Sequence, residues 1–455
     1  MRAFAQQLTE RAKAVAAVGA VAAFWLAAWV FVASLVAQPL ILPGPGAVVM
    51  SLLRLVCDAG TWVILVGSGA RILGGLALAV ACGGVLAGVA ARSRVFARLV
   101  APALSFVKAT PVACVVVLLL IWLGSARVSI AAVFLMALPG VYFSLVEGLA
   151  QVDKPLEQMF RLHGVRGWRL FCAHTWREVL PFVLSCAQAV IGMSWKAGVA
   201  AELIGMAVGT VGERIYQAKL LIETADLLAW TVLVVAASWA CERVLVWLLR
   251  ASGPVAWRAA VRAHGRSLQG RAGAADVAEL ALAVGDRAPW APALDGLVLN
   301  VPAGGRACVM GASGAGKTTL LALAAGECAP CSMMFQDARL VEDASALDNV
   351  LVCADARVDA SSAAALLRLL VPGIDVHACT AELSGGQRRR VEIARALLCP
   401  GGAVILDEPF IGLDVAARDA TAEVALDLLD GRTLLFATHD ASDAQALDIS
   451  DIITL

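Results

Sequence analysis

Residues 311–318 have the types and spacing of a loop that binds phosphate groups. They read Gly-Ala-Ser-Gly-Ala-Gly-Lys-Thr, which fits the pattern G-x-x-x-x-G-K-[ST], between an expected strand at 307–310 and an expected helix at 319–325. In such a loop, backbone N–H groups at a helix N-terminus surround the phosphate oxygens. We expect Lys317 to contact the β- and γ-phosphates of a nucleotide and Thr318 to bind Mg²⁺. The other residues expected to bind the nucleotide here are Gly311, Ser313, Gly314, Gly316 and Thr319.

A second candidate site follows an apolar run at 403–406, which ends in Asp407-Glu408-Pro409. A buried strand can carry Asp407 to the metal that accompanies the phosphates. Glu408 is then a candidate to polarise the attacking water. Acidic residues at the end of a strand often only cap the next turn, but their occurrence with a phosphate loop favours the catalytic interpretation.

The composition limits what kind of protein positions these residues. The chain has 455 residues, of which 60% are hydrophobic and 16% charged, and its 36 Lys and Arg balance 36 Asp and Glu. These values exclude a disordered chain, a purely cytosolic enzyme and a protein that binds nucleic acid by charge. The twelve cysteines are scattered, so we expect most of them to be reduced. No cleavage site follows the first apolar run, so no signal peptide is expected.

Six apolar stretches in the first 250 residues are candidates to cross a bilayer, which takes about 20 residues. They are expected at 15–36, 72–91, 112–123 with its flanks, 128–149, 179–208 and 227–249. Lys and Arg are enriched before the first stretch and after the second and fourth, so the N-terminus is expected in the cytoplasm. Six crossings return the chain to the cytoplasm. We predict an α-helical membrane domain at 1–250, a basic linker at 251–276 and an α/β phosphate-loop domain at 277–455.

Further motifs in the second domain resemble those of ATP-binding cassette (ABC) proteins. Leu-Ser-Gly-Gly-Gln at 383–387 resembles the ABC signature, and Ser384 is also a good N-cap for the helix that follows. Gln336 resembles the Q-loop glutamine, Asp414 the D-loop aspartate and His439 the switch histidine. The resemblance covers about residues 280–455 and implies that the nucleotide is ATP.

The resemblance also assigns roles to these residues. It implies that Gln336 contacts Mg²⁺ and senses the membrane domain, while His439 holds the γ-phosphate and Glu408. The catalytic residues are then Glu408, His439 and Gln336, and the metal-binding residues are Thr318, Gln336 and Asp407. The residues that complete the ATP site of a second cassette are Ser384, Gly385, Gly386, Gln387 and Asp414.

The cassette departs from the family pattern in one stretch. Only 19 positions separate Lys317 from Gln336, fewer than is usual in the family, so we expect its antiparallel β-part to be trimmed. Trp290 lies about where the family stacks an aromatic ring on adenine, but a packed loop tryptophan fits equally well. Cys328 and Cys331 form a single C-x-x-C, which we interpret as structural thiols because no second pair accompanies it.

The first domain resembles the permease subunits of ABC importers for nitrate, sulfonate, taurine and related solutes. The resemblance rests on residues 42–45, 68–75 and 152–164, covers about 39–250, and implies a type I importer fold with a coupling helix that docks onto the ATPase. The residues of this segment that it assigns to coupling are Gln158, Met159, Phe160 and Gly164. The first three replace the usual Glu-Ala-Ala, and Phe160 is expected to fill a groove near Gln336. An amphipathic surface helix is the alternative.

Two ionisable residues, Lys196 and Glu202, fall inside the fifth apolar stretch. A charge there costs roughly 2.5–3.5 kcal/mol and normally faces protein or water. Six positions place the two side chains on different faces of a helix, so we do not expect them to pair. Lys196 and Glu202 are our candidates for the substrate path. Lys196 could attract an anionic substrate, with a structural ion pair or a hydrogen-bonded role between helices as the alternatives, and Glu202 could bond neighbouring helices. We expect Arg71 to extend to the outer surface.

The chain carries one phosphate loop and one signature, whereas ABC proteins complete each ATP site with the signature of another cassette. The resemblance therefore implies a homodimer in the bacterial cytoplasmic (inner) membrane, in contact with lipid and using ATP and Mg²⁺. It further implies import of a small solute, such as a sulfonate- or nitrate-like anion or a vitamin precursor, from an extracytoplasmic binding protein. An exporter half-transporter and a non-transporting ATP-dependent membrane regulator stay open as alternatives.

Overall fold

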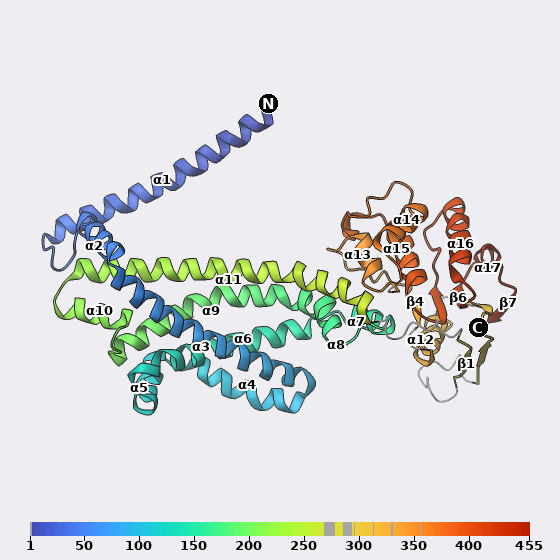
Figure 1. Ribbon diagram of the computed structural model, residues 1–455, viewed down its shortest axis with the longest axis horizontal. Coiled ribbons are helices and arrows are strands. Elements are labelled where there is room, and N and C mark those ends of the chain that lie inside the picture. The colour runs from blue at the N-terminus through green and yellow to red at the C-terminus, as the bar shows by residue number, and fades with distance from the viewer. Residues whose placement is uncertain are drawn as a thin grey trace. The chain divides into compact units, whose positions relative to one another are not determined.

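The computed structural model describes residues 2–267, 278–284, 294, 296–312, 314–328, 331–355 and 357–455. The chain divides into two compact units (Figure 1). Unit 1 consists of Met1–Ala150 and Leu180–Arg250, and unit 2 of Gln151–Val179 and Ala251–Leu455. The segment Gln151–Val179 lies between two membrane helices in the sequence, yet it packs with the phosphate-loop domain.

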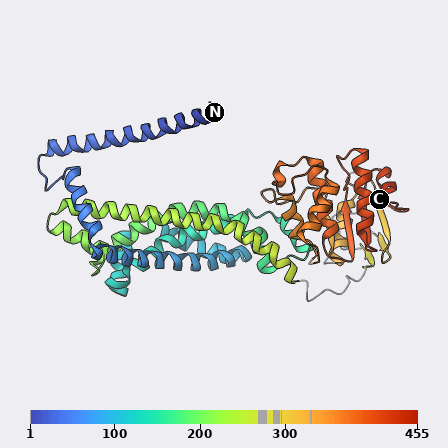
Figure 2. The same ribbon diagram turned by 45° about the horizontal axis from the view of Figure 1, so that its top comes forward.

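Unit 1 is built of helices (Figure 2). They are α1 (Arg2–Val36), α2 (Pro45–Cys57), α3 (Ala59–Arg92), α4 (Arg94–Ala109), α5 (Val112–Leu123), α6 (Ser125–Ala150), α9 (Trp176–Gly205), α10 (Val211–Leu220) and α11 (Thr224–Ser267). Among the described residues, five helices are long and apolar enough to cross a membrane, or six if α4 and α5 form one span bent by 102°. Pro111 separates these two because it restricts the residue before it to an extended conformation.

Glycines allow α3 to pack closely against two other helices of unit 1. A Cβ at Gly75 would lie 2.5 Å from the carbonyl oxygen of Ile130 on α6, and a Cβ at Gly198 on α9 would lie 2.5 Å from Cγ1 of Ile72. Small residues at such positions let membrane helices approach one another. Ile72 is completely buried in the core that these three helices share.

Helix α11 includes residues 251–267, where the composition predicted a linker. Trp257 and Ala260 are buried three positions apart, on one face of the helix, and the arginines near them are exposed. The basic residues therefore belong to the exposed face of a helix and not to a polar linker at these positions. Residues 268–276 of the predicted linker lie outside the described part of the chain.

The core of unit 2 is a five-stranded parallel sheet in the order β4-β5-β6-β3-β7. Its strands are β3 (Arg306–Met310), β4 (Ser332–Met334), β5 (Ala403–Asp407), β6 (Thr433–Thr438) and β7 (Asp451–Thr454). The inner strands read as continuous apolar runs because both faces of the sheet are covered. The phosphate loop and both acidic candidates follow the carboxyl ends of strands, where open α/β sheets bind ligands.

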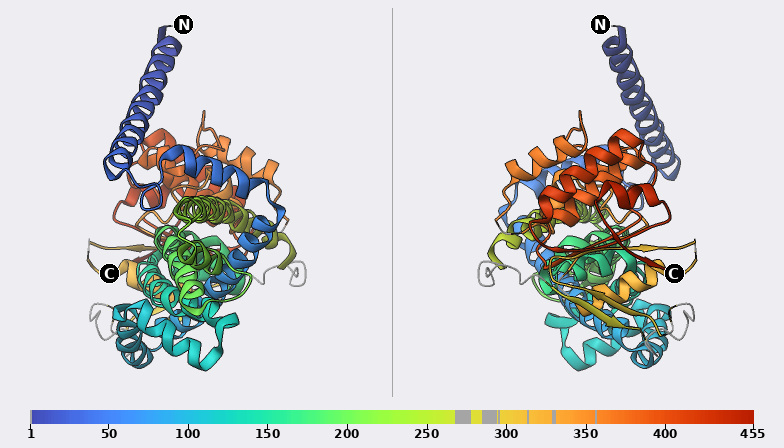
Figure 3. Two further views of the ribbon diagram at one scale, coloured as in Figure 1. Left: turned by 90° about the vertical axis from the view of Figure 1, so that its left-hand side faces the viewer. Right: turned by 90° about the vertical axis from the view of Figure 1, so that its right-hand side faces the viewer.

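Helices cover both faces of this sheet (Figure 3). One face carries α12 (Lys317–Glu327) and α7 (Lys154–Leu162), and the other carries α15 (Gly385–Leu398), α16 (Val415–Leu429) and α17 (Ala441–Ala446). A separate core joins α13 (Ala346–Leu351) and α14 (Ala360–Leu370) to α15.

Unit 2 also contains smaller elements, among them the 3₁₀ helix Thr380–Glu382. Strands β1 (Leu280–Ala283) and β2 (Val298–Val301) form a two-stranded antiparallel sheet. The segment after α7 continues into α8 (Gly167–Leu170) and a π-helical turn at Phe171–Thr175. The predicted fold class, a helical membrane part and an α/β phosphate-loop domain, is confirmed.

Candidate active site

The phosphate loop connects β3 to α12, with Thr318 and Thr319 in the first turn of the helix. Gly314 and Gly316 have φ angles of 86° and 98°, a left-handed conformation that glycine adopts without strain. Lys317 is buried, and its Nζ donates hydrogen bonds to the carbonyl oxygens of Gly311, at 2.8 Å, and Ala312, at 3.2 Å. The ammonium group is therefore held by the loop that is expected to bind phosphate.

Asp407 at the end of β5 meets the first turn of α12. The hydroxyl of Thr318 donates a 2.7 Å hydrogen bond to Oδ2 of Asp407. Oδ1 of Asp407 is buried and has no hydrogen-bond partner among the described residues. Burial raises the pKa of this carboxyl group, and the neighbouring Glu408 adds to the effect, whereas Thr318, Arg389 and Lys317 oppose it.

A buried carboxylate oxygen without a partner is costly unless a cation or a donor reaches it. Mg²⁺ prefers oxygen ligands and is usually held by one or two protein groups together with substrate phosphates. Thr318 and Asp407 therefore fit a magnesium site beside the phosphate loop.

Glu408 lies between two basic groups. Its Oε1 is 3.5 Å from Nζ of Lys317 and 3.6 Å from Nδ1 of His439. The residue is 8% exposed and has a φ of 48°, a conformation that costs a non-glycine residue free energy and is typical of functional sites. The side chain of His439 is more than half exposed, so this pair borders solvent from which water can enter.

Arg389 on α15 holds the backbone around both carboxylates, and the sequence analysis missed it. Its guanidinium donates hydrogen bonds to the carbonyl oxygens of Asp407, at 3.0 Å, and Glu408, at 2.6 Å. It also bonds the carbonyl oxygens of Phe335 and Gln336, at 3.0 and 2.7 Å. Arg389 is the middle residue of three consecutive arginines, and only the rotation of α15 selects it for burial.

The signature begins helix α15 with a complete capping box. The hydroxyl of Ser384 accepts a hydrogen bond from the backbone N–H of Gln387, and the side chain of Gln387 accepts one from the N–H of Ser384. Ser384 and Gly385 are exposed. A Cβ at Gly386 would lie 3.3 Å from Cδ2 of Leu413, so a larger residue there would require Leu413 to shift by a few tenths of an ångström. The helix N-terminus is thus open to an anion.

The remaining predicted residues of the cassette have separate surroundings. Asp414 caps α16 by accepting a hydrogen bond from the N–H of Ala417. Gln336 is exposed, and the bonds that link it to the site run from its carbonyl oxygen through Arg389. Ser313 and Trp290 lie outside the described residues.

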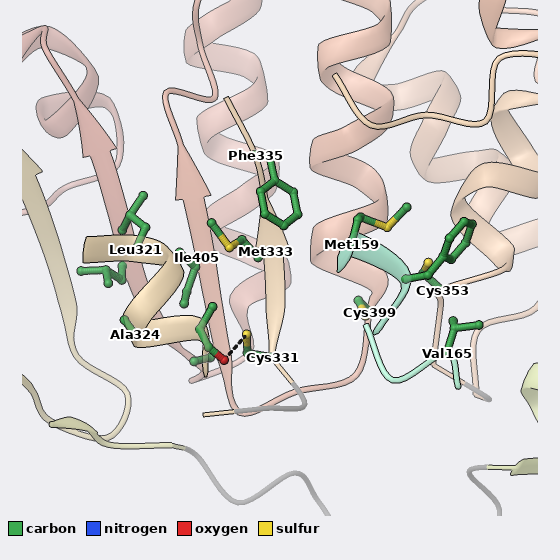
Figure 4. Packing of buried hydrophobic residues seen from close by; sticks show 14 of the residues in the cluster. Met159, Val165, Leu321, Ala324, Cys331, Met333, Phe335, Cys353, Cys399 and Ile405 are labelled. Atoms are coloured by element: carbon green, nitrogen blue, oxygen red, sulfur yellow. Dashed lines mark hydrogen bonds between the residues drawn. The ribbon is translucent and has the colours of Figure 1, made fainter. Parts of the chain in front are cut away.

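Helix α7 contains three of the predicted coupling residues and packs against residues of the cassette (Figure 4). Met159 and Phe160 are completely buried in one cluster with Met333 and Phe335, the residues just before Gln336. Gln158 is exposed. Phe160 is therefore packed beside the segment that leads into Gln336, and the apolar face of α7 is covered rather than exposed at the surface.

The turn after α7 brings in His163, which the sequence analysis also missed. Gly164 has a φ of 76°, the left-handed conformation that ends many helices. Nε2 of His163 lies 3.1 Å from the carbonyl oxygen and 3.3 Å from the backbone nitrogen of Met333 on the edge strand β4. Burial lowers the pKa of His163 to about 3, and the positive charge of Arg395 adds to the effect. The ring is therefore neutral.

The two ionisable residues predicted inside the apolar stretch of α9, Lys196 and Glu202, differ in their surroundings. Glu202 is completely buried, accepts hydrogen bonds from Ser68, at 2.8 Å, and Gly212, at 3.4 Å, and forms an ion pair with Arg71 at 3.1 Å. Glu202 thus bonds neighbouring helices as expected. Arg71 pairs with it instead of extending to the outer surface, because the buried carboxylate lies within its reach. Lys196 is exposed and does not pair with Glu202.

Two family models match the chain. A "Binding-protein-dependent transport system inner membrane component" matches residues 79–255, and an "ABC transporter" matches residues 294–411. The aliphatic sulfonates import ATP-binding protein SsuB 1 of Paracoccus denitrificans (strain Pd 1222) is 35% identical over 185 residues, which are 38% of this chain and 75% of that protein. SsuB of Escherichia coli (strain K12) is 37% identical over 176 residues, 34% of this chain and 68% of that protein.

These matches agree with the two units of the structure. The apolar helices and the permease match make the chain a multi-pass protein of the inner membrane, with its ATPase domain in the cytoplasm. The chain belongs to the ABC transporter family, and it joins a permease domain and an ATPase domain that couples ATP hydrolysis to transport in one polypeptide.

Proposed function

We propose that two copies of this chain form an importer of a small anionic solute of the sulfonate class, which an extracytoplasmic binding protein delivers. The observation that carries this proposal is the fusion of a binding-protein-dependent permease to a cassette with a single phosphate loop and a single signature. The solute class is supported by the two relatives named for the import of aliphatic sulfonates.

The need for two copies follows from the surroundings of the signature. Ser384 and Gln387 bond one another, and among the described residues no phosphate-loop residue bonds the exposed N-terminus of α15. In the homodimer, each signature covers the ATP held by the other phosphate loop. Asp414 at the N-terminus of α16 belongs to the same interface.

Within each site, the residues of this chain divide the chemical work. Lys317 leaves its carbonyl partners for the phosphates, and His439 bonds the terminal phosphate. Glu408 accepts a proton from the attacking water, and the ring of His439 holds its carboxylate in place. Thr318 and Asp407 would hold Mg²⁺, which would supply positive charge to the phosphate oxygens. Arg389 fixes the backbone of both acidic residues against Gln336.

Transport is coupled to this site through α7. Phe160 and His163 contact the strand that leads into Gln336, and Arg389 connects Gln336 to the carboxylates. A displacement of Gln336 on ATP binding is therefore passed to the segment between the membrane helices. In the membrane half, Lys196 supplies the positive charge that attracts the anion.

A complementation experiment tests the shared site. Lys317→Ala disables the phosphate loop and Gly386→Asp disables the signature, so each variant alone should lack ATPase activity. When both chains are co-expressed, half of the random dimers carry one intact composite site, and roughly a quarter of the parent activity should return. No recovery would show that the two sites are not shared between chains.

A second experiment tests import. In proteoliposomes with the cassette outside, the lumen corresponds to the extracytoplasmic side. A labelled alkanesulfonate trapped in the lumen should leave only when the co-purifying binding protein is inside and ATP is outside. ATP-driven movement of the label in the opposite direction would support an exporter. ATP hydrolysis without movement of any co-purifying ligand would contradict transport of this class of solute.

A further inference from the structure

The last turns of α11 and the start of α9 hold a second segment of the cassette, separate from the strand that α7 contacts. Nε1 of Trp257 donates a 3.2 Å hydrogen bond to Oδ2 of Asp348 on α13. The guanidinium of Arg177 lies over the ring of Trp257, with Cζ 4.8 Å from the ring centre, and forms an ion pair with Asp343. We call these four residues the clamp.

Two of the four clamp residues, Trp257 and Arg177, are largely buried. Trp257 is 4% exposed and the side chain of Arg177 is 15% exposed. A cation over an aromatic ring is held more strongly when both are desolvated. The two aspartates flank the N-cap Ser345, and the N–H of Asp348 donates to its hydroxyl. The clamp therefore holds the first turn of α13 in a defined orientation.

Helix α13 connects the clamp to the signature. Leu347 and Val350 of α13 share a buried core with Val391 and Ala394 of α15. The signature forms the N-terminus of α15. A rotation of α15 that moves the signature must also move α13, because side chains in a close-packed core cannot shift independently. This path does not pass through Gln336 or β4.

We propose that the clamp is a second coupling contact, through which the signature helix acts on α11. The contact exists because the permease and the cassette are one chain: α11 is a continuous helix from Thr224 to Ser267, and its C-terminal part carries Trp257. Arg177 and Trp257 are positioning residues in this scheme. ATP binding moves the signature helix, α13 follows, and the indole–carboxylate bond transmits the displacement to α11.

Hydrogen exchange on the full chain in lipid nanodiscs tests the proposal without knowledge of the solute. The parent is the Glu408→Gln variant, compared with and without ATP. We expect ATP to slow amide exchange in residues 251–263. Trp257→Phe keeps an aromatic ring under Arg177 but removes the indole N–H donor. The loss of this one hydrogen bond should reduce the effect of ATP on exchange roughly two- to tenfold. Asp343→Asn should reduce it as well, and because Asp343 is exposed this variant carries little risk to folding.

Trp176→Phe is the matched control. It removes an indole N–H that bonds Ser252 and leaves the four clamp residues in place, so the ATP effect on 251–263 should persist. Slower exchange in α12 on addition of ATP reports that nucleotide is bound in every variant. The proposal is overturned if 251–263 do not respond to ATP in the parent, or if Trp257→Phe and Asp343→Asn both respond as the parent does.

Discussion

Two buried carboxylates, Glu202 in the membrane unit and Asp407 in the cassette, show opposite kinds of bonding. Both oxygens of Glu202 accept hydrogen bonds, from Ser68, Arg71 and Gly212. Only one oxygen of Asp407 does, from Thr318, and the other is buried without a partner among the described residues. A saturated carboxylate joins structural elements, whereas an incompletely bonded one is prepared for a ligand. We propose from this comparison that Glu202 is a structural charge and Asp407 a functional one.

The largest effect is expected on ATP hydrolysis, from a change at Glu408, the residue next to Asp407. Glu408→Gln removes the proton acceptor but keeps the size and polarity of the side chain. We expect the rate of ATP hydrolysis to fall by about 10²–10⁴-fold, with ATP binding preserved. Release of phosphate and nucleotide affinity are measured on the full chain in nanodiscs. Glu423→Gln, an exposed position on α16, is the matched control, and unchanged hydrolysis in Glu408→Gln would remove Glu408 from catalysis.

Glu202 is expected to affect stability instead of the chemistry of ATP. Glu202→Leu leaves Arg71 without its partner, and breaking a buried ion pair from one side costs about 3–5 kcal/mol. Thermal unfolding should show a lower midpoint for the membrane unit, and nucleotide affinity should stay the same. The double variant with Arg71→Met should recover part of the loss, because no unpaired charge remains. A double variant as unstable as the single one would indicate that Arg71 is not the main partner.

The two regions also differed in how well the sequence predicted them. Asp407, Glu408 and the phosphate loop were predictable because their chemistry requires fixed residue types at the ends of strands. The Glu202 network was predictable only in kind, since two of its partners, Ser68 and Arg71, lie more than 100 positions away in the sequence. Arg389 and His163 were missed because rotation of a helix and docking of a turn, which no local pattern encodes, decide their burial.

The polar residues of α11 were misjudged for a related reason. Its arginines beyond residue 250 suggested a linker, but the helix continues because its apolar residues recur on one face. The composition of a segment is dominated by its exposed residues when only a few of its residues are buried. Trp257 was the signal in the sequence that a buried face exists there.

A smaller effect, on the Mg²⁺ requirement of the ATPase, is expected when a hydrogen-bond partner of Asp407 is removed and its charge is kept. Thr318→Val removes the hydroxyl that occupies Oδ2 and is expected to bind the metal. Because partners of metal sites typically contribute 10- to 100-fold to affinity, the Mg²⁺ concentration for half-maximal ATPase should rise by about that factor. A magnesium titration of ATP hydrolysis measures it, with Ser362→Ala, which removes an exposed hydroxyl on α14, as the control. An equal shift in both variants would mean that the effect is not specific to the Asp407 contact.

The smallest effect is expected on the pH dependence of stability, from the buried base His163. The pKa of His163 is lowered to about 3 in the folded chain, so the unfolded chain binds a proton more readily between that value and its ordinary pKa of about 6.5. Stability should therefore fall as the pH drops below 6.5, and between pH 7.5 and 5.5 this histidine should account for about 1 kcal/mol. His163→Asn should reduce the loss of melting temperature of unit 2 over this range, whereas His377→Asn, at an exposed position, should not. Equal acid sensitivity of His163→Asn and the parent would mean that the ring is not held neutral against Met333, and that the docking of α7 on β4 does not depend on its protonation state.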